Sequence, residues 1–219
     1  MLKENLFEIL NLIKEGNNLG EPITLVAATK TVPVDVINES IELGVKVVGD
    51  NKVQEFNEKS PFIKNASFHF IGHLQKNKVK YLVGKVDLIQ SVDTLSLAEE
   101  IDRISEKKGV ITNILLEVNI GEEESKSGFY KKDLISSFME IKKLTNVKVE
   151  GLMAMLPKTD DENLKKNLCL QMRELYDTIN KIEPITYLSV GMSEDFEVAI
   201  KNGSNMIRLG SKIYGKRTY

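Results

Sequence analysis

The sequence predicts an α/β protein, and more specifically a (β/α)8 TIM barrel with an extra N-terminal helix. Short apolar runs rich in Val, Ile and Leu alternate with amphipathic helical stretches along the whole chain. Most of these runs lack polar alternation, which is typical of parallel strands covered on both faces. Roughly eight strand–helix units in a chain of 219 residues fit a compact barrel. A doubly wound open sheet is the alternative.

The expected elements follow one another without a visible linker. A helix is expected from Leu2 to about Glu15, before the first strand. No Pro- or Ser-rich tract interrupts the alternation that follows, so we expect a single domain over residues 1–219. The strands are expected at residues 23–28, 45–49, 67–72, 87–92, 111–120, 147–154, 185–190 and 205–210.

Two of the connecting segments have a clear helical period. Residues 94–108 and 159–180 both carry apolar side chains at spacings of three and four. Thr159 and Glu162 have the spacing of a capping box, so we expect the second helix to begin there. The apolar stripes consist of Leu97, Ile101 and Ile104 in the first segment and Leu164, Leu168, Met172, Leu175 and Ile179 in the second.

Composition and charge exclude several classes of protein. Hydrophobic residues make up 42% and charged residues 28%, as in ordinary globular proteins, and the net charge of -2 does not favour a nucleic-acid partner. No apolar run approaches the ~20 residues of a membrane span, and the N-terminus lacks a signal-peptide core. Cys169 is the only cysteine, so no internal disulfide can form and we expect a cytoplasmic protein.

A lysine stands at the end of the first expected strand, in "LVAATKT" at residues 25–31. Lysine is seldom buried, so Lys30 either extends from the strand end to solvent or is held in a site. A lysine held in a site can act as a Schiff-base amine. In both architectures ligands bind at the carboxyl ends of the strands. Asn51 follows the second strand at the same edge and joins Lys30 as a candidate binding residue.

Glycine and serine follow the last two expected strands. Gly191 and Ser193 precede a helical run after the seventh strand, and Gly210 and Ser211 follow the eighth. Such turns can offer backbone N–H groups, and Ser193 its Oγ, to a phosphate, which barrels often bind at this position. A lysine amine opposite a phosphate cradle indicates a phosphorylated carbonyl ligand, of which pyridoxal 5'-phosphate is the leading case.

An arginine interrupts the last apolar run, "NMIRLG". Arg208 forms either a structural ion pair in the barrel or a contact with the pyridine nitrogen of the cofactor. A guanidinium has no acceptor and keeps its proton, so it would leave that nitrogen unprotonated. The ring would then be a weaker electron sink than one paired with a carboxylate.

These residues lie in stretches that resemble the pyridoxal 5'-phosphate homeostasis protein family (YggS/PROSC type), which is related to the alanine racemase barrel. The resemblance implies a (β/α)8 barrel with Lys30 as the Schiff-base lysine and with phosphate contacts from Ser193 and the Gly210–Ser211 turn. It places Arg208 where the racemase arginine faces the pyridine nitrogen. The chain has Asp50 where the family commonly has Glu. The matching stretches are "LVAATKTVP", "GDNKVQE", "FHFIGHLQKNK", "VNIGEEESKSG", "EGLMAMLP", "LSVGMSEDFEVAI" and "MIRLGSKIYGKR".

Two functions remain open at this point. The first is a non-catalytic cofactor carrier in vitamin B6 homeostasis, with apo-enzymes as candidate recipients and a monomer expected. The second is an amino-acid racemase or related enzyme, which needs an acid–base group on each face of the cofactor. Lys30 can serve one face, and in the larger racemases a tyrosine from a separate domain serves the other. We expect no such tyrosine here and favour the carrier; a sugar-phosphate Schiff-base enzyme is a third, weaker alternative.

A metal site is not expected. His69 and His73 span a strand and the turn after it rather than one helix face, and only one cysteine is present.

Overall fold

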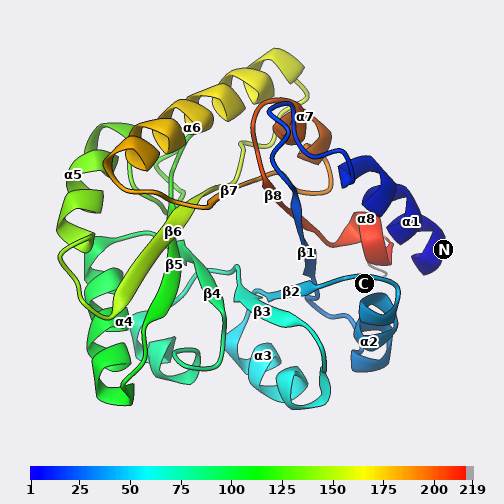
Figure 1. Cartoon of the computed structure of the whole chain (residues 1–219), viewed down its shortest axis with the longest axis horizontal. Helices are drawn as coiled ribbons and strands as arrows, with labels where there is room; N and C mark the ends of the chain where they lie inside the picture. Colours follow the sequence, from blue (N-terminus) through cyan, green and yellow to red (C-terminus); the bar gives the residue numbers. More distant parts are fainter. Residues whose placement is uncertain (216–219) are drawn as a thin grey trace.

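The computed structural model describes residues 1–215, and in that range eight parallel strands close into a barrel in the order β1 to β8 (Figure 1). Closure confirms the predicted (β/α)8 fold and rules out the open sheet. Each strand begins and ends within two residues of the limits predicted for it, except that β5 ends three residues early. The strands are β1 (Thr24–Ala28), β2 (Val47–Asp50), β3 (Ser67–Phe70), β4 (Leu88–Val92), β5 (Thr112–Glu117), β6 (Val147–Ala154), β7 (Tyr187–Val190) and β8 (Met206–Leu209).

Helices surround the barrel, and the predicted extra helix α1 precedes it (Figure 1). α1 packs beside the short α8, where the Asn5 amide donates a 3.0 Å hydrogen bond to the Ile213 carbonyl. Between β3 and β4 the connection is a 3-10 turn, η2, instead of an α-helix. The helices are α1 (Leu2–Ile13), α2 (Val34–Glu42), α3 (Val53–Lys59), η1 (Ser60–Phe62), η2 (Lys76–Tyr81), α4 (Leu95–Lys108), α5 (Lys131–Ile141), α6 (Glu162–Ile182), α7 (Phe196–Lys201) and α8 (Ser211–Tyr214).

The start of α6 differs from the prediction. Its N-cap is Asp161, whose carboxylate accepts the backbone N–H groups of Asn163 and Leu164 at 2.9 and 3.1 Å. Thr159 accepts only the Asp161 N–H, so the predicted capping box is wrong. Asp is as good an N-cap residue as Ser or Thr. Asp161 caps the helix because it directly precedes the first helical residue, whereas Thr159 lies two residues earlier. Leu164, expected on the buried stripe, is 40% exposed because it lies in this first turn.

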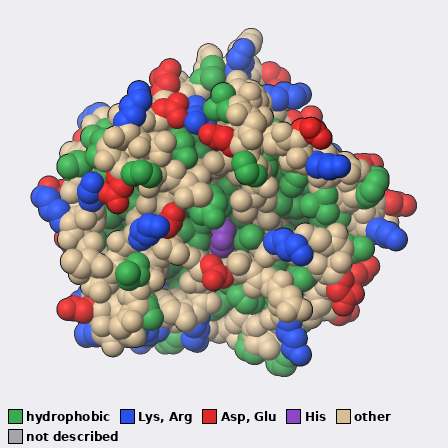
Figure 2. All heavy atoms as spheres, in the orientation of Figure 1, with side chains coloured by type: hydrophobic (Ala, Val, Ile, Leu, Met, Phe, Trp, Pro, Cys, Tyr) green, Lys and Arg blue, Asp and Glu red, His purple; other side chains and the backbone are tan. Residues whose placement is uncertain are grey.

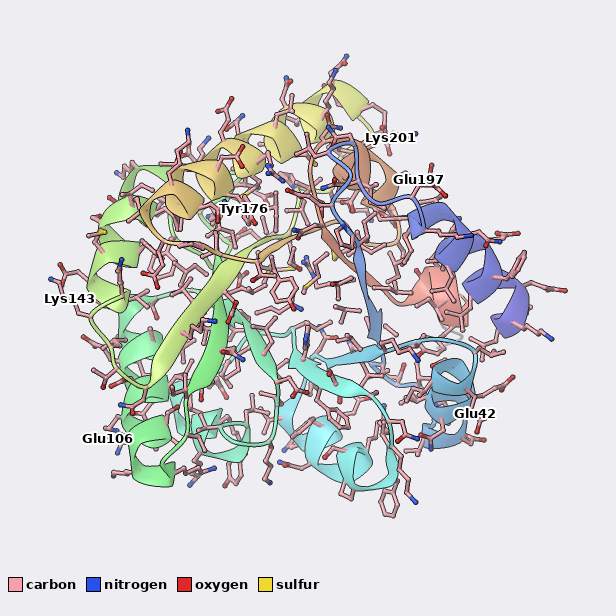
Figure 3. The ribbon with its side chains drawn as sticks, viewed as in Figure 1. Glu42, Glu106, Lys143, Tyr176, Glu197 and Lys201 are labelled. Atoms are coloured by element: carbon pink, nitrogen blue, oxygen red, sulfur yellow. The ribbon has the colours of Figure 1, made fainter. Side chains whose placement is uncertain are left out.

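Most of the apolar core lies between the barrel and its helices. Figure 3 shows Tyr176 of α6 on the barrel side of its helix, where its hydroxyl donates a 2.8 Å hydrogen bond to the Ile185 carbonyl. Glu42, Glu106 and Lys143 lie on the outer rim in the same view. Among residues 1–215, no helix is long and apolar enough to cross a membrane.

The barrel interior combines an apolar layer with buried polar side chains. Gln90, Ser189 and Arg208 are each at most 5% exposed although they lie inside the barrel. Buried polar groups normally need hydrogen-bond partners, so these three residues require one another or the backbone. The apolar interior layer consists of Val26, Ile71, Leu88, Leu115, Met153 and Met206.

Candidate functional site

A cavity of about 340 Å³ opens at the carboxyl ends of β1 and β8. Lys30, which follows β1, is half-buried and lines it. Gly210 and Ser211, which follow β8, line the same cavity together with Tyr214. The structure therefore brings three of the six predicted site residues to one cavity, because parallel pairing of β1 with β8 places their ends side by side.

The backbone on both sides of Lys30 is held by hydrogen bonds. The Thr29 hydroxyl donates to the Asp50 carboxylate at 2.8 Å, and the Thr29 carbonyl accepts from Lys59 at 2.9 Å. Thr31 has a φ of 64°, and its N–H donates to Glu55 at 2.5 Å. A β-branched residue at positive φ is strained by about 1–2 kcal/mol, so these contacts maintain a turn that the local sequence disfavours.

Ser193 is connected to the turn after β8 through its hydroxyl. Its Oγ lies 3.4 Å from the Gly210 N–H and 3.3 Å from the Lys212 N–H, and it accepts from both. Position 210 is tightly packed, because a Cβ there would lie 3.3 Å from the Ala28 carbonyl oxygen. The result is a turn of backbone donors beside one hydroxyl, which is an arrangement that suits an anion.

Arg208 lies on β8 in the barrel interior, two residues before Gly210, and is 5% exposed. Its guanidinium donates to the Ser189 carbonyl at 2.8 Å, to the Ser189 hydroxyl at 2.6 Å and to the Ala154 carbonyl at 3.0 Å. Burial lowers the pKa of Arg208 to about 10, against the opposing attraction of Asp195 and Glu117. The side chain therefore stays charged at neutral pH while its hydrogen bonds go to neutral acceptors.

Two buried carboxylates, Glu117 at the end of β5 and Asp195 at the start of α7, attract Arg208. Burial, with a contribution from Asp93, raises the pKa of Glu117 to about 6. Burial also raises the pKa of Asp195, although the Met192 N–H bond and Arg208 act in the opposite direction. His73 lies 3.3 Å from Asp93 and is largely exposed. In the described residues, no group of three or more His, Cys, Asp or Glu side chains could hold a metal ion.

Asn51, like Ser193 and Arg208, is a predicted site residue that does not line the cavity. It follows β2 and is half-buried, and its backbone approaches Gly72 so closely that a Cβ there would lie 2.1 Å from the Asn51 carbonyl oxygen. This contact gives Asn51 a backbone role in joining the ends of β2 and β3.

Comparison with known proteins decides the family. Residues 18–218 match the family described as the alanine racemase N-terminal domain. The pyridoxal phosphate homeostasis protein of Aquifex aeolicus is 43% identical over 199 residues, which cover 89% of this chain and 87% of that protein. The protein of the same name from Haemophilus influenzae is 33% identical over 213 residues, or 94% of this chain and 90% of that one.

The chain belongs to the pyridoxal phosphate homeostasis protein family. PipY of Synechococcus elongatus, solved with PLP bound, superposes with a TM-score of 0.87 at 27% identity and covers 98% of this chain and 100% of PipY. Alanine racemase of Clostridium difficile shares the fold, with a TM-score of 0.83 at 17% identity. That match covers 100% of this chain but 57% of the racemase.

Several residues that shape the site of this chain have roles that the sequence does not indicate. Asp50 was singled out only as a departure from the usual Glu, yet it is 1% exposed and holds the Thr29 hydroxyl beside Lys30. Ser189 and Gln90 appeared to be ordinary strand residues. Both faces of β4 and β7 are covered, so the sequence does not mark the direction of these side chains, and the link from Gln90 through Ser189 to Arg208 required the closed barrel.

Proposed function

We propose that this protein binds pyridoxal 5'-phosphate, holds it as a Schiff base on Lys30, and acts without catalysis in intracellular vitamin B6 homeostasis. One observation carries the proposal: Lys30 and the Gly210–Ser211 turn line the same cavity. The names of the homeostasis relatives and the PLP-bound structure of PipY support the choice of ligand.

The residues present fit this cofactor. The ligand carries an aldehyde and a phosphate, so a site for it needs an amine, anion-binding donors and a pocket of drug-like size. The cavity of about 340 Å³ offers Lys30, Ser211 and the backbone at Gly210. The missing side chain at Gly210 leaves the space that a Cβ would fill.

Each part of the site then has a separate task. The bound cofactor supplies an electrophilic aldehyde and an electron-withdrawing ring. The Lys30 amine attaches covalently, and the bonds to Thr29 and Thr31 fix the backbone that carries it. Ser193, Gly210 and Ser211 bind the phosphate. Arg208 would face the ring nitrogen and, as a donor without an acceptor, leave it unprotonated.

The carrier is favoured over a racemase. Racemisation needs an acid–base group on both faces of the ring, and Lys30 supplies one. Tyr214 lines the cavity, but its hydroxyl lies 3.0 Å from Ser40 Oγ and is hydrogen-bonded to it. The matched region amounts to 57% of the Clostridium difficile racemase, so much of that enzyme has no counterpart in the match.

The cytoplasm is the proposed compartment, with apo-enzymes as recipients of the cofactor. Support comes from Cys169, which is buried on α6 and forms no disulfide. Burial raises the pKa of its thiol to about 12, so the thiol stays protonated and unreactive at neutral pH.

The test of attachment is borohydride reduction of the protein after incubation with pyridoxal 5'-phosphate. Mass spectrometry should locate the pyridoxyl adduct on Lys30, and Lys30→Ala should lose both the adduct and the near-visible absorbance. Lys52→Ala is the matched control, because it removes an exposed lysine after the neighbouring strand β2. An adduct found mainly on another lysine in the parent protein would refute the assignment.

A second assay separates the carrier from a racemase. The loaded protein is incubated with L-alanine in deuterated water, and α-deuteration and D-alanine are both followed. A single base on one face can exchange the α-proton with little inversion, so we expect slow deuteration without sustained D-alanine. D-alanine production that disappears in Lys30→Ala would establish the racemase instead.

A further inference from the structure

Four buried side chains form a continuous hydrogen-bonded chain across the barrel interior. Arg208 of β8 donates to Ser189 Oγ of β7 at 2.6 Å, and Ser189 Oγ donates to Gln90 Oε1 of β4 at 2.7 Å. Gln90 Nε2 lies 2.9 Å from His69 Nδ1 of β3. None of the four is more than 7% exposed. The chain therefore links Arg208 of β8, through β7 and β4, to a histidine on β3.

Arginine fixes the direction of the first bond in this chain, and the orientation of the Gln90 amide fixes the others. A guanidinium has only donors, so Ser189 Oγ accepts from Arg208 and uses its own hydrogen on Gln90 Oε1. The Gln90 amide nitrogen, which is only a donor, then faces His69 Nδ1. His69 must accept at Nδ1 and carry its proton at Nε2. With the Gln90 amide in the opposite orientation, its nitrogen would face Ser189 Oγ and the serine hydrogen would lose its acceptor in the chain.

The far end of the chain lies at the opposite mouth of the barrel. His69 lines a cavity of about 240 Å³ formed at the amino-terminal ends of the strands, with Thr24, Ser67 and Tyr187. Figure 2 shows a histidine in a hollow near the centre of the visible face, with acidic and basic side chains interspersed around it. Burial lowers the pKa of His69 to about 4, so the ring is neutral at physiological pH, as the chain requires.

Ser189 is the one side chain that orients the Arg208 guanidinium through a hydrogen bond in residues 1–215. The other two acceptors are the Ser189 and Ala154 carbonyls, which belong to the strands themselves. Asp195 and Glu117 attract Arg208 but form no hydrogen bond with it in the described chain. A change in the Ser189 hydroxyl, or in the Gln90 amide that holds it, is therefore expected to alter the donors that Arg208 presents.

We propose that Ser189 and Gln90 are positioning residues of the cofactor site, which fix the orientation of Arg208 and hold His69 as the Nε2–H tautomer. The role rests on the proposed function, in which Arg208 faces the ring nitrogen of the cofactor. The directed chain itself does not depend on a bound ligand, so the two can be tested separately.

The first test uses cofactor-free protein and nitrogen NMR of the His69 ring. In the parent we expect the proton on Nε2 and a bare Nδ1. Ser189→Ala removes the donor that holds the Gln90 oxygen, so the amide can rotate and the Nδ1–H tautomer should become populated. Ser91→Ala is the matched control, since Ser91 is equally buried but donates to the Gly72 carbonyl at 2.6 Å, outside the chain.

Gln90→Glu provides a second variant with the opposite chemistry. A carboxylate at this position only accepts, so it should draw a proton to Nδ1 and reverse the tautomer of His69. An Nδ1–H tautomer in the parent would overturn the proposed direction of the chain. Equal responses of His69 in Ser189→Ala and Ser91→Ala would overturn the coupling.

The second test adds pyridoxal 5'-phosphate and follows the near-visible absorbance against pH. Ser189→Ala should shift the titration midpoint of the bound cofactor by about half a pH unit or more, because the charge facing the ring is reoriented. Ser91→Ala should leave the midpoint unchanged. Equal midpoints in both variants and the parent would overturn the positioning role. Failure of the parent to take up cofactor would overturn the proposed function. The tautomer measurement would still test the direction of the hydrogen-bonded chain.

Discussion

Replacing His69 should remove a pH-dependent part of the stability. Burial lowers the pKa of His69 from 6.5 to about 4 in the folded protein. Between these values the unfolded chain binds a proton that the folded chain does not, so the free energy of unfolding rises with pH. One pKa unit corresponds to about 1.4 kcal/mol, so the contribution is up to about 3 kcal/mol, gained from pH 4 to 6.5 and constant above.

The assay is urea unfolding of cofactor-free protein at several pH values between 4 and 8. His69→Asn keeps an acceptor for the Gln90 amide but cannot titrate, so its unfolding free energy should lack this rise. Any cost of the smaller side chain is independent of pH and shifts the whole curve. His73→Asn is the control, because it removes an imidazole that is largely exposed.

The informative quantity is the slope of the free energy of unfolding against pH, compared between the parent and His69→Asn. Glu117, with a pKa raised to about 6, acts in the opposite sense over part of the same range and is common to both proteins. Identical slopes in the parent and in His69→Asn, or a His69 that titrates near 6.5 by NMR, would refute the reasoning.

Three further predictions concern the phosphate, a buried carboxyl and the strand packing. Ser193→Ala should speed cofactor loss on dialysis, since a hydrogen bond to a charged group is worth about 1.5–3 kcal/mol; equal loss from the parent would exclude Ser193 as a ligand. Glu117→Gln should raise the free energy of unfolding at pH 7 by up to about 2 kcal/mol and leave it little changed at pH 4, because the folded carboxyl binds its proton more tightly than the unfolded one. Gly151→Ala should lower the melting temperature far more than Gly109→Ala, because its Cβ would lie 1.9 Å from the Tyr187 carbonyl oxygen, whereas the Cβ at Gly109 meets open space. Comparable melting temperatures for these two alanine variants would contradict the close approach.

The sequence alone determined the fold class and the order of its elements. Apolar runs without polar alternation predicted all eight strands, because a strand covered on both faces has no solvent-exposed face that needs polar residues. The same pattern placed Lys30, Gly210 and Ser211 at strand ends, and these residues share one cavity in the structure. Helix boundaries are harder to predict from the sequence. Thr159 and Asp161 are both good N-cap residues, and the folded structure shows that Asp161 is the one used.

Tertiary structure decided which polar residues act together. Arg208 was noticed in the sequence because charge is rare in an apolar run, but Ser189 and Gln90 have small or neutral side chains that many strands contain. The Gln90–Ser189 bond joins positions 99 residues apart and the Ser189–Arg208 bond positions 19 residues apart, and both exist because ring closure brings β4, β7 and β8 around one interior. The local sequence pattern indicates where a strand lies. The side chain that a residue meets across the barrel depends on strand register and barrel closure, which arise only when the whole chain has folded.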